Sequence, residues 1–254
     1  MSLVTKKEKM LLGRGKSKLI SVILPSRKRF GLLLKSLESL YSKAKDPSRI
    51  EAIIRFDKDD ISSISKISKL PFDKIDLSVI VGNRMRGYID LNKYINECCS
   101  ISTGDFLFLF NDDSTVITDN WDLEIEKYSG QTVVLNPDTD DDAQQFNTFP
   151  IISRDIFDTV GHFSLQAHND TWVSEVGKML GIQKHLSIKI FHDRPDNEAY
   201  TGTTDEREDD DITWKERTEI FPTSNQEFWG SKFTALRRED AVKIYNEIIN
   251  KENK

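Results

Sequence analysis

The chain has 254 residues, of which 37% are hydrophobic and 31% charged, and 42 acidic against 36 basic side chains give a formal net charge of −6. This size and composition fit one sizeable folded domain and exclude a disordered chain. No run reaches the roughly 20 apolar residues of a membrane helix. The acidic balance also lacks the basic footprint of a nucleic-acid-binding protein. Because residues 1–18 lack the apolar segment of a secretory signal, we expect a soluble, cytoplasmic protein.

Most of the net charge is concentrated in one segment. Residues 205–211 (DEREDDD) hold six acids and one arginine, a net charge of −5. Such a run favours a solvated loop over a binding role. The two cysteines, Cys98 and Cys99, are adjacent within a helical pattern and have no C-x-x-C spacing. We therefore expect them to be buried as small apolar side chains, without a metal or a disulfide.

The first half of the chain alternates short apolar runs with segments of helical periodicity. The runs predict strands over residues 19–24, 52–56, 77–81 and 105–110, and the periodic segments predict helices over 30–41, 61–70 and 88–99. Strands that alternate with helices indicate βαβ units. We therefore expect an α/β fold of the Rossmann-like type, with a mostly parallel central sheet flanked by helices.

The second half is less regular. The pattern predicts strands over residues 132–135, 149–152 and 186–191, and helices over 121–128, 154–160, 171–180 and about 238–250. Between them we expect a turn-rich acidic loop over 136–145 and an irregular chain after Pro195. Trp121 and Trp172 could offer apolar platforms to the ring of a ligand, but core packing is the more usual fate of such residues.

Polar and charged residues follow each strand of the first half. The first strand is followed by residues 25–29 (PSRKR), the second by Asp57, the third by residues 82–87 (GNRMRG) and the fourth by Asp112 and Asp113. Parallel sheets bind ligands at the carboxyl ends of their strands. Carboxylates and arginines gathered there are what a phosphate-bearing ligand with a hard divalent cation needs.

The acid pair follows a fully apolar strand, DFLFLF, at residues 105–110. Two acids at the end of a buried strand need a neutralising partner. Mg²⁺ or Mn²⁺ bridging to a diphosphate would provide one. The alternative is that Asp112 and Asp113 only cap the following turn, and the pair alone does not decide between the two.

The order of these pieces resembles the inverting, family 2-type glycosyltransferases of GT-A fold. The resemblance is carried by SVILPSRKR, by EAIIRFDKDD and by the segment from Gly82 to Asp113. It covers residues 18–113 well and extends to about residue 192. It implies a single GT-A domain over 1–254, in which 18–113 bind the nucleotide-sugar, 114–200 form the acceptor and catalytic half, and 201–254 hold the acidic loop and a C-terminal helix.

The resemblance assigns roles around the donor nucleotide. Pro25, Ser26 and Arg29 would line the nucleotide pocket, and Asp57 would hydrogen-bond the base. In the segment before the acid pair, the residues that would contact the base or the diphosphate are Arg86 and, as further candidates, Tyr88 and Asn92.

The resemblance also assigns the metal ligands. Asp113 would be the main ligand, and Asp112 would touch ribose or sugar hydroxyls. Phe110 replaces the first acid of the family's Asp-x-Asp-Asp arrangement, which weakens the case for a second carboxylate ligand. His192 resembles the histidine that supplies a late metal contact in some GT-A enzymes. The alternative for His192 is an ordinary loop residue.

The expected catalytic base lies at a predicted helix start. The family usually has Glu-Asp there, and in this sequence Asn169 takes the first place and Asp170 the second. The helix dipole stabilises a carboxylate at that position, so Asp170 would be ready to accept a proton. The alternative is that it serves only as a helix N-cap.

The resemblance thus implies a metal-dependent, inverting sugar transfer from a nucleotide donor, with a UDP-sugar favoured, to a hydroxyl of a glycan or other acceptor. Mn²⁺ or Mg²⁺ would be the cofactor. Two alternatives stay open. One is nucleotidyltransfer or nucleotide-sugar hydrolysis on the same fold. The other is a non-catalytic nucleotide- or glycan-binding module, which the missing first acid and Asn169 make plausible.

Overall fold

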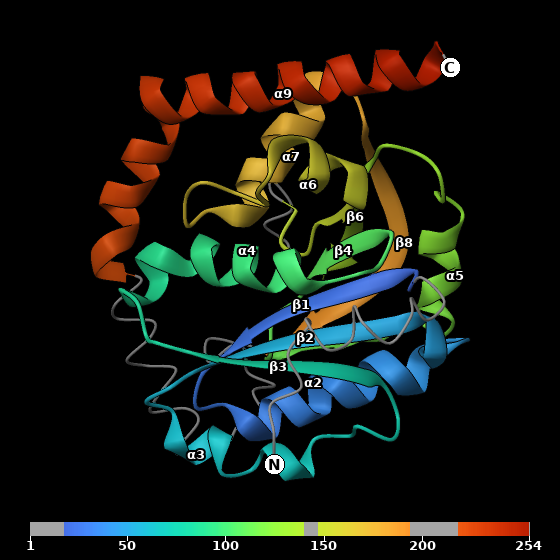
Figure 1. Cartoon of the computed structure of the whole chain (residues 1–254), viewed down its shortest axis with the longest axis vertical. Coiled ribbons are helices and arrows are strands. Elements are labelled where there is room, and N and C mark those ends of the chain that lie inside the picture. The colour runs from blue at the N-terminus through green and yellow to red at the C-terminus, as the bar shows by residue number, and fades with distance from the viewer. Residues whose placement is uncertain (1–17, 140–146, 194–217, 254) are drawn as a thin grey trace.

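A computed structural model describes residues 18–139, 147–193 and 218–253 and shows a central sheet with helices on both faces (Figure 1). The strands are β1 (Ile20–Ser26), β2 (Ile50–Asp57), β3 (Asp76–Gly82), β4 (Phe106–Leu109), β5 (Ser114–Val116), β6 (Val134–Thr139), β7 (Ile151–Ser153) and β8 (Gln183–His192). The α-helices with defined bounds are α2 (Phe30–Lys43), α3 (Ile61–Ile64), α4 (Leu91–Ile101), α5 (Trp121–Glu126), α6 (Arg154–Val160), α7 (Asn169–Leu180) and α9 (Ser231–Glu252).

Within the described ranges, the sheet has eight strands in the order β3-β2-β1-β4-β7-β6-β8-β5. β3, β2, β1 and β4 run parallel to one another, and β6 is parallel to β8. β7 is antiparallel to both β4 and β6, and β5 is antiparallel to β8. The α/β fold expected from the sequence is confirmed, with a parallel half and a mixed half.

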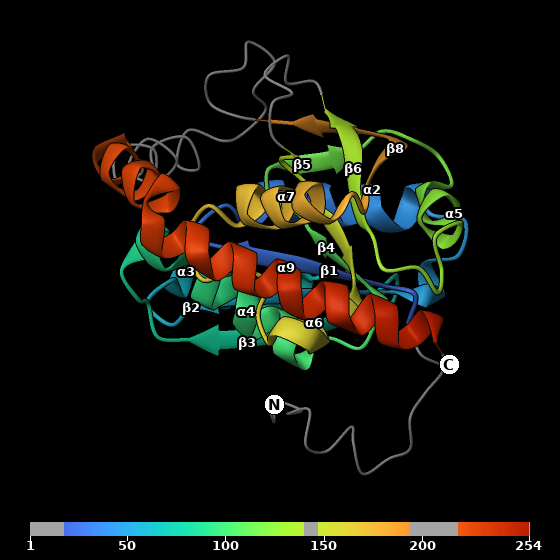
Figure 2. The same cartoon turned by 90° about the horizontal axis from the view of Figure 1, so that it is seen from above.

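Two hydrophobic clusters lie on opposite faces of the sheet. One packs α2 and α5 against alternate residues of β1 and β2, such as Val22 and Ile54. The other packs α4, α6, α7 and α9 against the residues between them, such as Ile23 and Ile53. Figure 2 shows α9 crossing the second face, and α9 packs on both α6 and α7. The central strands are buried on both faces, which explains why they appear in the sequence as continuous apolar runs.

Gly104 fixes the position of β4 beside β1. A Cβ at this position would lie 2.6 Å from Ser21 Oγ and 2.7 Å from the Ser21 backbone nitrogen, so only glycine fits. The Gly104 N–H donates to Ser21 Oγ at 2.7 Å, and the same hydroxyl donates to Glu51 Oε1 at 2.7 Å. One small residue and one buried hydroxyl thus join three neighbouring strand regions.

Several sequence predictions are wrong in detail. The helix expected over 61–70 breaks into α3 and the 3-10 turn Ile67–Lys69, because serine and β-branched isoleucine are weak helix formers. The loop expected from residue 136 is strand as far as Thr139, since pairing with β8 overrides the turn signal of Asn136-Pro137. The chain is helical over 218–229, and α9 begins at Ser231 rather than near residue 238.

The remaining expectations concern two loops, the tryptophans, the cysteines and membrane-spanning helices. Residues 140–145 of the expected loop and the acidic run 205–211 lie outside the described residues. Trp121 and Trp172 are buried in the core, and both cysteines are buried free thiols. Across the described ranges, no helix combines the length and the apolar character needed to cross a bilayer.

Candidate functional site

The carboxyl ends of the parallel strands bring the predicted site residues to one edge of the sheet. Pairing of β1 with β2 places Ser26 beside Phe56, and pairing of β2 with β3 places Asp57 beside Gly82. The segments that follow these strands therefore meet at the same edge. Ser26 is buried and Pro25 is partly buried, both at the end of β1.

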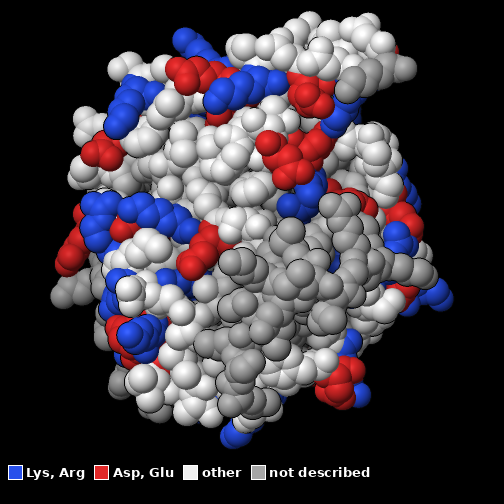
Figure 3. Space-filling view, in the orientation of Figure 1, with Lys and Arg blue, Asp and Glu red and all other residues white. Residues whose placement is uncertain are grey.

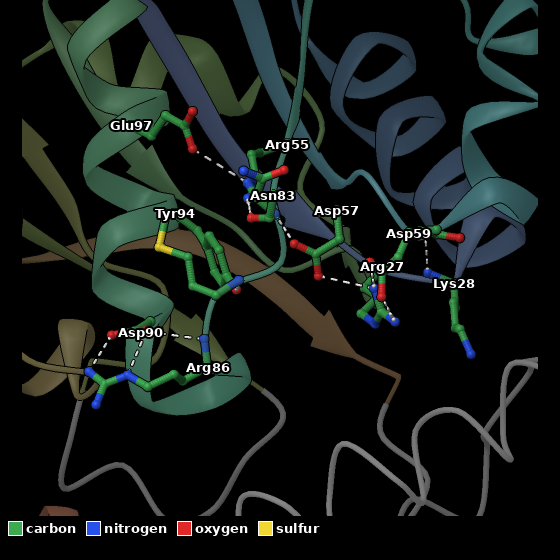
Figure 4. Close-up of polar contacts among 12 residues, drawn as sticks. Arg27, Lys28, Arg55, Asp57, Asp59, Asn83, Arg86, Asp90, Tyr94 and Glu97 are labelled. Atoms are coloured by element: carbon green, nitrogen blue, oxygen red, sulfur yellow. Dashed lines mark hydrogen bonds and ion pairs between the residues drawn. The ribbon is translucent and has the colours of Figure 1, made fainter.

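Asp57 lies between two arginines at this edge (Figure 4). The Arg27 guanidinium contacts Asp57 Oδ2 at 3.1 Å, and Arg55 contacts Asp57 Oδ1. Arg27 also binds Asp59 Oδ1 at 2.7 Å. The predicted base-binding carboxylate is thus 5% exposed and held in place by charge on both sides.

Arg55 organises the segment that follows β3. Its side chain is 2% exposed, it donates to the Asn83 carbonyl at 2.5 Å, and its guanidinium lies 4.1 Å from the ring centroid of Tyr94 on α4. Tyr94 Oη accepts the Met85 N–H at 2.7 Å. Neither Arg55 nor Arg27 was assigned a role from the sequence, although Arg27 lies within the PSRKR segment that was expected at this edge. The available signal for Arg55 was a charged residue inside the apolar run IIRF.

Arg86 turns toward the start of α4 rather than toward Asp57 (Figure 4). Its Nε and Nη2 donate to the Asp90 carboxylate, each at 2.9 Å, while the side chain stays 69% exposed. Asn92 is buried on α4. Tyr88, in the turn before α4, packs edge-on against His168 with ring centroids 6.3 Å apart. This contact places the start of α7 near the segment that follows β3.

The acid pair lies in the turn between β4 and β5. Asp112 is completely buried and Asp113 is 7% exposed. Arg29, which directly precedes α2, bridges the two: Nη2 lies 2.5 Å from Asp112 Oδ1, and Nη1 lies 2.7 Å from Asp113 Oδ2. Arg29 was predicted to line the nucleotide pocket, and the structure places it on the acid pair.

His192 reaches Asp113 through the pairing of β5 with β8. This pairing sets Ser114 opposite His192, and His192 Nε2 then lies 3.1 Å from Asp113 Oδ1. The Asp193 N–H donates to the Asp113 carbonyl at 2.7 Å. The two residues predicted as metal ligands are therefore neighbours, although they are far apart in the sequence.

The charged groups around Asp113 favour the ionised form of its carboxyl group. Burial by itself would raise the pKa of its carboxyl, but the positive charge of Arg29 and the neighbouring His192 outweigh burial and hold that pKa well below its usual range. The carboxylate is therefore ionised at any pH at which the protein would work, as a metal ligand must be.

The donor set around Asp113 fits Mn²⁺ or Mg²⁺ bound together with a diphosphate. A carboxylate and an imidazole are ligands that Mn²⁺ accepts, and the Asn111 amide lies 3.3 Å from His192 Nε2. Within the described ranges, no three His, Cys, Asp or Glu side chains gather closely enough to hold a metal by themselves. Phosphate oxygens and water would have to complete the coordination, as is usual for Mg²⁺.

Asp170 lies in the first turn of α7, half-buried, and His168 is the N-cap of that helix. Asp170 Oδ1 accepts the Thr171 N–H at 2.8 Å. Asn169 is buried and donates to the Ala167 carbonyl at 2.7 Å. The helix start expected from the sequence is confirmed, and the dipole of α7 stabilises the carboxylate there.

The C-terminal helices hold the start of α7, which the sequence did not indicate. Ser224 lies in the helix over 218–229, and its hydroxyl is 3.0 Å from His168 Nε2. The Gln166 side-chain amide donates to the Ser224 backbone carbonyl at 2.9 Å. On α9, Asp240 accepts the Trp172 indole N–H at 3.0 Å and lies 3.4 Å from His162 Nε2. These helices therefore belong to the framework of the site.

No protein-family model matches the chain, and no curated protein matches its sequence. Solved structures match it at low identity. Residues 1–349 of TarS from S. aureus superpose with a TM-score of 0.55 at 14% identity, over 68% of this chain and 60% of that one. The same part of TarS has been solved with UDP and with UDP-GlcNAc.

The mannosyltransferase PcManGT from Pyrobaculum calidifontis, solved with GDP-Man and Mn²⁺, superposes over 97% of this chain and 93% of that one. The TM-score is 0.58 and the identity 9%. The chain has a GT-A fold. At these identities the likeness establishes the GT-A fold alone, and the chain spans about 60% of the TarS fragment. The roles of individual residues must come from their geometry.

Proposed function

We propose that this protein is a metal-dependent, inverting glycosyltransferase that moves a sugar from a nucleotide donor to a hydroxyl of a glycan or other acceptor. The observation that carries the proposal is the joint placement of Asp113, His192 and the arginines at the carboxyl edge of a GT-A sheet. The solved relatives that bind UDP-GlcNAc or GDP-Man support a nucleotide-sugar donor.

The geometry around Asp57 supports a UDP-sugar. Guanine offers two adjacent N–H groups, whereas uracil offers one N–H between two carbonyls. Arg27 and Arg55 each occupy one Asp57 oxygen, so the carboxylate has less capacity left to accept a pair of N–H bonds. Arg27, with its side chain 24% exposed, can also donate to a uracil carbonyl.

In the proposed reaction the acceptor oxygen attacks the anomeric carbon, and the bond from that carbon to the diphosphate oxygen breaks. The acceptor proton passes to the Asp170 carboxylate, and the nucleoside diphosphate leaves. A cation bound at Asp113 and His192 would stabilise the negative charge of the departing diphosphate. Asp57 orients the base, and no covalent sugar–protein intermediate is needed.

The charged side chains of the described residues are mixed in sign on one face of the molecule. On the face shown in Figure 3, basic and acidic side chains are interspersed, and neither sign covers a large area of the described residues. The described part of this face therefore has no continuous basic surface of the kind that nucleic-acid binding requires.

The test of donor binding is calorimetric titration of UDP, GDP and dTDP, with and without Mn²⁺. We expect UDP to bind with Mn²⁺ and not to bind Asp113→Ala. The matched control is Asp119→Asn, which removes an exposed carboxylate paired with Lys43 and leaves UDP binding unchanged. Failure of all three nucleotides to bind would contradict the proposal.

The test of Asp170 as the catalytic base is the variant Asp170→Asn. We expect UDP affinity to be retained and the rate of sugar transfer to fall by about 10²- to 10⁴-fold, the usual contribution of a general base. Glu175→Gln on the same helix is the control and keeps the wild-type rate. Free sugar as the sole product would indicate a hydrolase, and no product from any nucleotide-sugar would indicate a binding module.

A further inference from the structure

Arg29 already fills the cationic position that both acids require. Its Nη2 lies 2.5 Å from Asp112 Oδ1, and its Nη1 lies 2.7 Å from Asp113 Oδ2. The acids are almost fully buried, so this charge neutralises them where water cannot. An arginine fork spanning two carboxylates is a strong, charge-assisted contact.

Both oxygens of the expected metal ligand are engaged in the free protein. Asp113 Oδ2 faces Arg29, and Asp113 Oδ1 faces His192 at 3.1 Å. A divalent cation that reaches Asp113 has to displace one of these contacts. His192 can turn a nitrogen lone pair to the cation, but a guanidinium is always charged and has no acceptor atom. Arg29 is therefore the group that must leave.

We propose that Arg29 is the built-in counter-ion of the metal site. In the free protein it competes with the divalent cation for Asp113, and when metal and donor bind it moves to the diphosphate of the nucleotide. The second half rests on the proposed function, whereas the first half concerns the cation alone. Metal and diphosphate then bind as a pair, and binding of the metal alone is weak.

The local structure allows such a movement. The Arg29 backbone is fixed, because its carbonyl accepts the Leu33 N–H at 2.9 Å in the first turn of α2. The side chain is 20% exposed, so its end can turn without movement of the helix. The fork that binds two carboxylates also matches a phosphate group.

The test begins with Mn²⁺ alone, titrated into the full chain and followed by electron paramagnetic resonance. Removal of a positive charge a few ångströms from the site should tighten Mn²⁺ binding by about tenfold in Arg29→Ala. Arg29→Lys keeps the charge and should lie between Arg29→Ala and the wild type. Arg49→Ala is the matched control, since it loses the same charge at a partly exposed pair with Glu126 and should bind Mn²⁺ like the wild type.

The second arm titrates UDP at saturating Mn²⁺. Here Arg29→Ala should bind UDP about tenfold more weakly, because the diphosphate loses a charged donor. The two arms thus change in opposite directions. A merely structural role for Arg29 would weaken both.

Circular dichroism checks that each variant folds. If Arg29→Ala does not fold, both arms are repeated with Arg29→Gln, which keeps a polar side chain of intermediate length without the charge. Mn²⁺ binding that is unchanged or weaker in the neutral variants, or absent from every protein, overturns the inference. The proposed transferase function would survive that result, because it is tested by the transfer products. Tighter Mn²⁺ binding in the neutral variants without binding of UDP, GDP or dTDP by the wild type would instead refute the proposed function.

Discussion

The Asp57 carboxylate balances the positive charges of two arginines, Arg27 and Arg55, that come from different segments of the chain. Arg55 is 2% exposed, and Asp57 Oδ1 is the acid oxygen nearest to its Nη1. The exposed Asp59 shares Arg27 with Asp57. The stability of this edge therefore depends on the buried acid much more than on the exposed one.

We expect Asp57→Asn to lower the free energy of unfolding by about 3 kcal/mol, because it leaves the buried charge of Arg55 without its nearest anion. The matched control, Asp59→Asn, removes only an exposed partner of Arg27 and should cost less than about 1 kcal/mol. Urea unfolding measures both. Equal losses in the two variants would contradict this account of the edge.

Arg27 and Arg29 show why the site was only partly predictable at the level of residues. The sequence correctly indicated that acids and arginines would gather at one edge. It did not indicate which arginine meets which acid. Arg27 and Arg29 are two residues apart, yet Arg27 binds Asp57 and Arg29 binds the acid pair. Lys28 separates them with φ 58°, a left-handed backbone that directs its two neighbours differently.

At the level of elements, the turn Gly87–Asp90 and helix α4 are joined through one carboxylate. Asp90 accepts from the Arg86 side chain and from its backbone N–H at 3.1 Å, and Lys93 Nζ lies 2.8 Å away. The Arg86 hydrogen bonds, with help from Lys93, hold the pKa of the Asp90 carboxyl well below its usual range despite opposing desolvation.

This shift predicts a pH dependence. Because the folded pKa is lowered, the ionised Asp90 stabilises the fold above the ordinary carboxyl pKa of about 3.9, and this contribution is lost as the pH falls through the lower, folded value. In urea unfolding, Asp90→Asn should therefore be less stable than the wild type at about pH 6, with a smaller difference at about pH 3. An equal difference at both pH values would contradict the role of the charge.

At the level of the whole molecule, α9 closes the face of the sheet that carries α7. Asp240 lies 3% exposed on α9 and binds both Trp172 and His162. These three residues line a small cavity, with about 10 Å³ accessible to water, together with Val134 and Ile244. The contact joins the C-terminal helix to the helix that begins with the proposed base.

We expect Asp240→Ala to lower the free energy of unfolding by about 2 kcal/mol, since the buried indole N–H of Trp172 loses its acceptor. Glu239→Ala, at the exposed neighbouring position on α9, should change stability by less than about 0.5 kcal/mol. Thermal unfolding compares the two. A loss in Glu239→Ala as large as in Asp240→Ala would show that α9 responds to any change of charge.

The sequence by itself determined the alternation of strands and helices, the edge at which the polar residues gather, and the helix start at Asn169 and Asp170. These follow from local periodicity, from the residues after each strand and from turn chemistry, which act over a few positions.

Tertiary structure alone decided the antiparallel strands, the short strand β5 and the part played by the C-terminal helices. β5 has three residues and exists because it pairs with β8, and that pairing brings His192 to Asp113. Asp240 meets Trp172 across 68 positions of sequence. Such contacts depend on packing between distant segments, so no local pattern in the chain predicts them.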